Sequence, residues 1–227
     1  MISLVLAAVF FVGIHVCISG TRLRDTLVAR LGEGAFQGLF GMLSLVGLVW
    51  LTTAYADAPT TPLWGELYAL KPVAMVVVLL AFVLVVVGLT TPSPTAIGGE
   101  GTLDLDDPAR GILRVTRHPF LWGVSLWAAT HLVINGEASA LVLFGALLLL
   151  AVVGTRSIDR KRRRTLGDRW ERFEDVTSNV PFGAIVQGRN RLVVSELSLG
   201  MIGMAVGIYL LVLVTHPFMF GVSALPH

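Results

Sequence analysis

Residues 138–164 read ASALVLFGALLLLAVVGTRSIDRKRRR, an uncharged apolar run that turns within a few residues into a strongly basic one. The apolar part, Ala138–Thr155, has about the length that an α-helix needs to cross the hydrocarbon core of a bilayer, roughly 17–25 residues. The basic part is too costly to bury in hydrocarbon and marks the point where the helix leaves it. This stretch predicts a membrane-spanning helix with a charged extension.

The rest of the chain has the same character. Of its 227 residues, 55% are hydrophobic and only 14% are charged, with a mean hydropathy of +0.79, which is typical of an integral membrane protein. Five further runs carry little or no charge: Ile2–Ile18, Phe36–Ala56, Pro72–Leu89, Phe120–Gly136 and Leu197–Pro217. We therefore expect an all-α, polytopic helical bundle of about six transmembrane helices, forming a single membrane domain over residues 1–227 within the lipid bilayer.

Basic residues are distributed very unevenly between the loops. Six spans would place 16 of the 17 Lys and Arg residues on one side and leave Lys71 on the other. Because loops rich in Lys and Arg stay cytoplasmic, both termini are expected outside the cytoplasm. Ile2–Ile18 lacks a basic segment before it and a small-residue cleavage site after it, so we expect a retained first span rather than a signal peptide.

The two long loops, 90–117 and 156–196, would both lie on the cytoplasmic side. Attraction to anionic lipid head groups accounts for the basic run at 160–164. Trp170 and Phe173 are three residues apart and share one face of a short helix, which suits a helix at the membrane surface or over a cytoplasmic mouth. The loop 156–196 is also a candidate surface for a partner protein.

Small residues and cysteine add little chemistry. Gly34 with Gly38, and Gly203 with Gly207, have the GxxxG spacing that allows close helix packing in membranes. Cys17 is the single cysteine, which excludes an intramolecular disulfide. The sequence contains no CxxC, HExxH, P-loop or GxSxG motif, so no catalytic residue is assigned. Its modest net charge of +2 requires no nucleic acid partner.

Histidines near or within the spans are the candidate functional residues, because a polar group in hydrocarbon must be compensated. His118 and His131 are 13 residues apart, about 20 Å of rise and roughly 220° of rotation on a straight helix, so they cannot bind one metal together. At most one of them pairs with His15. The estimated depth of each histidine in the membrane mildly favours His118 as the partner of His15. His131 is the alternative partner, and His216 is a third possibility.

Four segments in order resemble the NnrU family of membrane proteins. They are the N-terminal GIHVCISGTRLRDTLVARLGEGAFQGLFGMLSLVGL, RHPFLWG at 117–123, WAATH at 127–131 and GDRWERFEDVTSNVPF at 167–182. The resemblance implies haem b bound by His15 and His131 as metal ligands, with His118 and Arg117 close but not axial. It also implies a haem-dependent cis–trans isomerase of a polyene, like 15-cis-ζ-carotene isomerase, or a redox protein linked to denitrification in a bacterial inner membrane. An apolar small-molecule substrate would enter from the lipid.

The RHP segment is also similar to that of isoprenylcysteine and related membrane methyltransferases, which bind S-adenosylmethionine. Arg117, His118 and Pro119 match that pattern, and Gly167, Trp170 and Phe173 match a second segment loosely. The glutamates expected just before the second segment are absent, and Asp159-Arg160-Lys161 occupies their place. S-adenosylmethionine is thus the alternative cofactor, and a non-catalytic assembly or scaffold factor is the third possibility.

Overall fold

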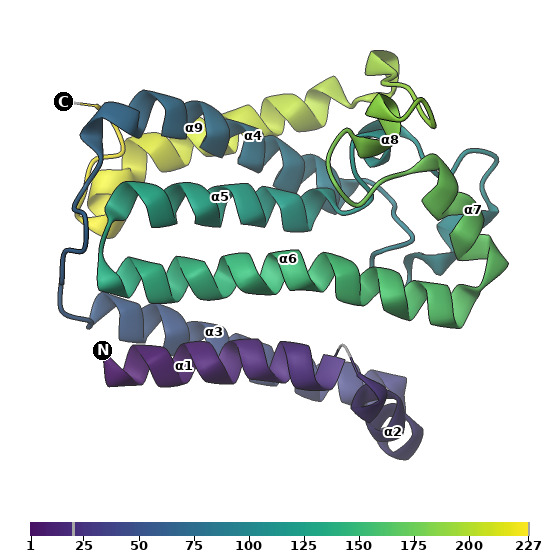
Figure 1. The fold of residues 1–227 in the computed structure, drawn as a ribbon, viewed down its shortest axis with the longest axis horizontal. Helices are drawn as coiled ribbons and strands as arrows, with labels where there is room; N and C mark the ends of the chain where they lie inside the picture. Colours follow the sequence, from purple (N-terminus) through teal and green to yellow (C-terminus); the bar gives the residue numbers. More distant parts are fainter. Residues whose placement is uncertain (20, 227) are drawn as a thin grey trace. The chain divides into compact units, whose positions relative to one another are not determined.

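The computed structural model describes residues 1–19 and 21–226, which form helices and no β-strand apart from an isolated bridge between Pro62 and Glu137 (Figure 1). The α-helices are α1 (Ile2–Ile14), α2 (Arg22–Leu31), α3 (Glu33–Ala56), α4 (Lys71–Thr90), α5 (Pro119–Asn135), α6 (Ala138–Leu166), α7 (Asp168–Val176), α8 (Gly183–Val186) and α9 (Leu199–Phe220). The shorter helical turns are the π-helix η1 (His15–Ser19) and the 3-10 helices η2 (Tyr68–Leu70), η3 (Gly99–Asp104), η4 (Gly111–Arg114) and η5 (Val194–Glu196).

The all-α membrane class is confirmed. Four helices within the described residues are long and apolar enough to cross a bilayer: Glu33–Ala56, Tyr68–Thr90, Ala138–Leu166 and Leu199–Phe220. A fifth candidate results if the bent pair Ile2–Ile18 and Arg22–Leu31 is one span. The structure thus gives four to five candidates against the six expected. One expected span, Ile2–Ile18, counts only as part of the bent pair. The other is α5, whose 17 residues rise only about 25 Å, somewhat less than the roughly 30 Å hydrocarbon core.

The chain divides into two compact units, described separately here. Unit 1 contains residues 1–67 and 128–154, and unit 2 contains residues 68–127 and those from Thr155 onward. The prediction of a single domain is not tested by this division.

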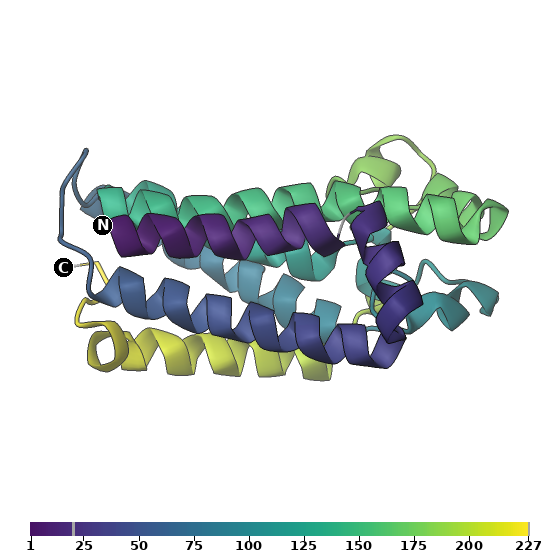
Figure 2. The ribbon, with the colours of Figure 1, turned by 90° about the horizontal axis from the view of Figure 1, so that it is seen from below.

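In unit 1, α1 runs antiparallel along α3 (Figure 2). The indole Nε1 of Trp50 donates to Ser3 Oγ at 3.1 Å near the start of α1. Further along, a Cβ on Gly47 would lie 3.0 Å from the Phe10 ring, so a glycine allows the two helices to approach here. Leu4 and Leu51 are fully buried in this interface.

Unit 1 also contains the turn between α5 and α6. Gly136 has a φ of +60°, in the left-handed region that favours glycine. Its carbonyl accepts the backbone N–H groups of Leu63, Trp64 and Gly65. The segment before α4 is thereby tied to the end of α5.

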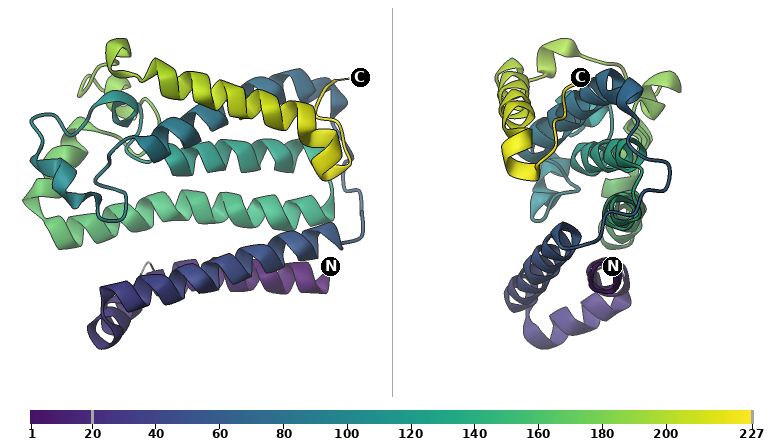
Figure 3. Two further views of the ribbon diagram at one scale, coloured as in Figure 1. Left: turned by 180° about the vertical axis from the view of Figure 1, so that it is seen from behind. Right: turned by 90° about the vertical axis from the view of Figure 1, so that its left-hand side faces the viewer.

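In unit 2, α4 packs along α9 (Figure 3) and lies against the first half of α5. A Cβ on Gly88 would lie 2.8 Å from the backbone nitrogen of Phe120, and one on Gly123 would lie 2.8 Å from the carbonyl oxygen of Ala81. Close packing at the predicted GxxxG pairs is not observed, since a Cβ on any of these glycines would meet no described atom within 4 Å. Those glycines are Gly34, Gly38, Gly203 and Gly207.

The rest of unit 2 is a polar cap, defined here as residues 91–118 and 156–198. Its core is an apolar cluster in which Trp170 and Phe173 of α7 pack with Ile112 and Leu113 of η4. Trp170 and Phe173 are 0% and 1% exposed, so the aromatic face of α7 is buried in protein and does not lie on a membrane surface. The short helix predicted from these two residues is confirmed as α7, and the face that they share packs into the core of the cap.

Candidate functional site

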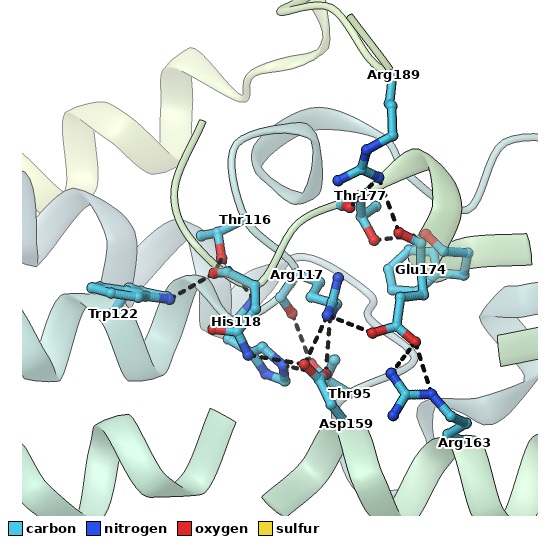
Figure 4. A network of polar contacts seen from close by, with 12 residues as sticks. Thr95, Thr116, Arg117, His118, Trp122, Asp159, Arg163, Glu174, Thr177 and Arg189 are labelled. Carbon is cyan, nitrogen blue, oxygen red and sulfur yellow. Dashed lines mark hydrogen bonds and ion pairs between the residues drawn. The ribbon is translucent and has the colours of Figure 1, made fainter. Parts of the chain in front are cut away.

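A buried polar network occupies the polar cap where α5 begins (Figure 4). The carboxylate of Asp159, one turn beyond the apolar part of α6, accepts from Arg117 Nε at 3.0 Å and Nη2 at 2.8 Å. It also accepts from His118 Nε2 at 2.7 Å and from Asn179 Nδ2 at 2.9 Å. The side chains of Arg117, His118 and Asp159 are 6%, 1% and 9% exposed. The network is therefore a dry, bidentate ion pair with every carboxylate oxygen bonded.

Glu174 of α7 extends this network toward the surface. Its Oε1 accepts from Arg117 Nη2 at 2.8 Å, and its Oε2 accepts from Arg163 Nη2 at 2.6 Å (Figure 4). The loop that follows α7 is attached as well, because Thr116 Oγ1 and Trp122 Nε1 both donate to the carbonyl of Asn179. The loop before α5, the end of α6 and α7 are thus held together by one set of charges.

The electrostatics at Asp159 follow from these contacts. Asp159 lies in the charged extension of α6, beyond the apolar segment. Burial raises the pKa of its carboxyl group, but the hydrogen bonds from His118 and Arg117 outweigh burial, and the pKa is well below its usual range. Asp159 is consequently an anion at neutral pH.

The basic run at 160–164 has two different roles. Arg162 is buried and binds Glu100 and the carbonyl of Ala96, while Arg163 binds Glu174. Arg160 is exposed on the surface. The sequence-based explanation by lipid head groups therefore does not apply to Arg162 and Arg163, which hold the cap together.

His15 is the first residue of the π-helical turn η1 in unit 1. Its Nδ1 lies 2.7 Å from the carbonyl oxygen of Phe11, and its Nε2 lies 3.4 Å from Ser44 Oγ. The ring contacts those of Phe11 and Phe40, with centroids 4.6 Å and 5.2 Å away. Because a carbonyl can only accept, Nδ1 carries the proton and the lone pair of the neutral ring lies on Nε2.

His131 is placed elsewhere in unit 1. Its ring lies 5.0 Å from that of Phe144 on α6, which in turn lies 6.0 Å from the ring of Tyr55. His15 contacts α3 at Ser44, 11 residues before Tyr55, and this separation corresponds to about 16 Å along the helix. Each of the two histidines thus has its own set of contacts within unit 1.

The remaining histidines have other contacts. His118 Nε2 is bonded to Asp159, and His216 Nδ1 lies 2.8 Å from the carbonyl oxygen of Val222. Within residues 1–19 and 21–226, no group of three or more His, Cys, Asp or Glu side chains is arranged to hold a metal ion. Arg117 donates through Nε and Nη2 to the carboxylates of Asp159 and Glu174, and His118 donates through Nε2 to Asp159.

Sequence reasoning missed Asp159 as the partner of the RHP segment. The signal was present, since Asp159 is the one carboxylate within a strongly basic stretch, 156–164. Sequence reasoning also missed two cavities in the polar cap. One of about 370 Å³ is lined by Arg117, Glu174 and the loop 177–180, and a larger one of about 450 Å³ lies on the other side of α7, with Arg189 lining both.

Comparison with known proteins gives one family and two named relatives. The NnrU family, described as "NnrU protein", matches residues 3–224. The chloroplastic 15-cis-zeta-carotene isomerase of Zea mays is 33% identical over 82 residues, 36% of this chain and 22% of that protein. Its counterpart in Arabidopsis thaliana is 31% identical over 120 residues, 50% of this chain and 32% of that protein. The chain thus matches a third or less of these relatives' length, and no solved structure matches.

Proposed function

This chain belongs to the NnrU family of membrane proteins, and on that basis we propose that it is a haem b-dependent cis–trans isomerase of a long apolar polyene. Both named relatives are isomerases of a carotene, a conjugated hydrocarbon. Since this chain matches only part of the length of these relatives, their activity is a proposal for this chain.

The geometry of His15 is the observation that carries the haem part of the proposal. A metal-binding histidine commonly donates its second ring N–H to a backbone carbonyl or a carboxylate, which fixes the tautomer. His15 has this arrangement, with Nδ1 bonded to Phe11 O and the Nε2 lone pair directed toward Ser44. Its position at the start of η1 agrees with the tendency of π-helical turns to occur at functional sites.

The contacts of His15 support the role of a haem ligand, and the ligand role of His131 stays a prediction from family resemblance. We therefore propose that His15 is the histidine that would hold haem b, and that this does not depend on His131. When bound, haem b supplies a redox-active iron able to interact with a conjugated double bond. The residues around His15 hold its ring and exclude water, because Phe11 and Phe40 contact the imidazole.

A long apolar substrate would reach this site from the lipid. Only 17% of the apolar window of α3 is buried, and Leu45, Val46 and Val49 are exposed on it. A hydrocarbon chain can lie along such a surface without losing contact with apolar atoms, so no aqueous entry path is needed.

The cellular placement is part of the same proposal. We place the polar cap in the cytoplasm of a bacterium, with both termini outside the inner membrane, because Lys and Arg concentrate in the cap. In a Cys17→Ser background, Pro226→Cys should react with a membrane-impermeant maleimide in intact spheroplasts, and Thr165→Cys should react only after lysis. The reverse pattern would overturn this orientation.

The isomerase proposal is tested with the purified full chain in detergent, loaded with haem and reduced with dithionite. We expect conversion of the 15-cis double bond of ζ-carotene, followed by chromatography, and loss of conversion in His15→Ala. His216→Ala is the matched control, because His216 also donates through Nδ1 to a backbone carbonyl but lies near the end of α9. Haem binding without conversion would favour a redox protein, and a chain that binds no haem would contradict the proposal.

A further inference from the structure

The larger cavity in the polar cap is independent of the proposed isomerase site. Its volume of about 450 Å³ lies within the range of small-molecule sites, roughly 300–1,000 Å³. Four arginines line it, contributed by η4, α7 and the segment after α8: Arg114, Arg169, Arg172 and Arg189. Among the described residues, the acidic ones that line it are Asp106 and Asp107.

Three of these arginines are already engaged by protein groups. Arg114 binds Glu196, Asp107 and Asn190 through all its nitrogens. Arg169 pairs with Asp104 at 2.6 Å, and Arg189 donates through Nη1 to the carbonyl groups at the end of α7. Their charges remain next to the cavity, but their donors are mostly used.

Arg172 differs from the other three. No hydrogen bond or ion pair of its guanidinium is found among the residues that the structure describes, although it lines the cavity beside three other cations. An arginine presents a planar fork of N–H donors that matches the oxygens of a carboxylate or a phosphate. Asp107 is paired with Arg114, so Asp106 is the acidic residue of the lining that would oppose an anion most.

Another part of the lining is apolar. It consists of Leu103, Leu105, Pro108, Ala109, Phe173 and Val176. Ala109 and Phe173 are each 1% exposed and belong to the core of the cap, whereas Leu105 and Val176 are 55% and 39% exposed and offer apolar surface. A site that combines an arginine with apolar surface fits an amphipathic molecule better than an inorganic ion.

We propose that this cavity binds an organic anion, with its phosphate or carboxylate group at Arg172 and its apolar part against Leu103, Leu105 and Val176. Such a group can belong to a free small molecule or to the head group of an anionic phospholipid. The two sources share the chemistry and differ in how the ligand reaches the cap.

The test uses the purified full chain in a neutral detergent, with hexyl phosphate as the probe and calorimetric titration as the readout. We expect saturable binding of hexyl phosphate that is tighter than that of inorganic phosphate. Arg172→Gln should weaken it about tenfold, the scale of one charge-assisted hydrogen bond. Asp106→Asn should tighten it, because a like charge is removed. Arg160→Gln is the matched control, since Arg160 is an exposed arginine outside the cavity and should change binding less than twofold.

Equal weakening by Arg172→Gln and Arg160→Gln would show general charge attraction and overturn the site. Absence of saturable binding would do the same. Nanodiscs distinguish the two sources of the ligand: phosphatidylglycerol nanodiscs that compete with hexyl phosphate, where phosphatidylcholine nanodiscs do not, identify a lipid head group. Equal binding of hexyl phosphate in the two kinds of nanodisc identifies a free anion. All outcomes are independent of whether the chain binds haem.

Discussion

Replacing Asp159 by asparagine tests the central polar network of the cap. The change keeps the shape of the side chain and removes the charge that Arg117 and His118 face at 2.7–3.0 Å. Breaking a buried ion pair from one side typically costs 3–5 kcal/mol, because the remaining charge stays buried. Arg117 keeps Glu174 as a second partner, so we expect the lower end of that range, about 3 kcal/mol, or roughly a 150-fold change in the unfolding equilibrium.

Urea unfolding in mixed micelles, followed by tryptophan fluorescence, measures this loss as a lower midpoint. The control is Asp104→Asn, which removes an ion pair at the surface. The side chains of Asp104 and its partner Arg169 are 69% and 41% exposed, so this change should alter stability by about 1 kcal/mol or less. In an Arg117→Gln background, Asp159→Asn should be less destabilising, because the uncompensated cation is gone. An Asp159→Asn chain no less stable than Asp104→Asn would refute the reasoning.

Two further predictions concern stability elsewhere in unit 2. The pKa of Glu196 is lowered from its usual 4.5 to about 2. The largest cause is the hydrogen bond from the side chain of Arg114, followed by the hydrogen bond from the backbone N–H of Gly111. The stabilisation by Glu196 should therefore be fully present above about pH 5 and be lost as the pH falls toward 2, and unfolding titrations of wild type and Glu196→Gln should converge there. Gly88→Ala should destabilise the chain by about 1–3 kcal/mol in the same micelle assay, since its Cβ would lie 2.8 Å from a backbone nitrogen. Gly207→Ala, with open space around the new Cβ, should have no such effect.

Much of the fold was predictable because hydrophobic length and charge decide it. The apolar run Ala138–Thr155 and its basic extension indicated a helix that leaves the membrane, and α6 continues without interruption to Leu166. The count of spans was harder to predict, because α5 lies at the lower limit of length.

Packing between helices depends on facing side chains and was not predictable from glycine spacing. Gly34 and Gly38 have the expected motif but no close neighbour, whereas the isolated Gly88 and Gly123 lie directly against other helices. A spacing rule identifies which glycines could allow contact, and only the partner's position shows which of them do.

The candidate site was partly predictable from the sequence. His15 stood out because a lone polar residue in an apolar span requires compensation, and the structure supplies it through Phe11 and Ser44. The partner of the RHP segment was not found, because Arg117 and Asp159 are 42 residues apart and meet only in the folded cap.

Haem content per chain, measured as the pyridine haemochrome of the purified protein, tests the central claim most directly. The proposed single ligand predicts that wild type and His131→Ala retain haem and that His15→Ala loses it. Equal loss in His15→Ala and His131→Ala, or retention of haem in His15→Ala, would contradict the account.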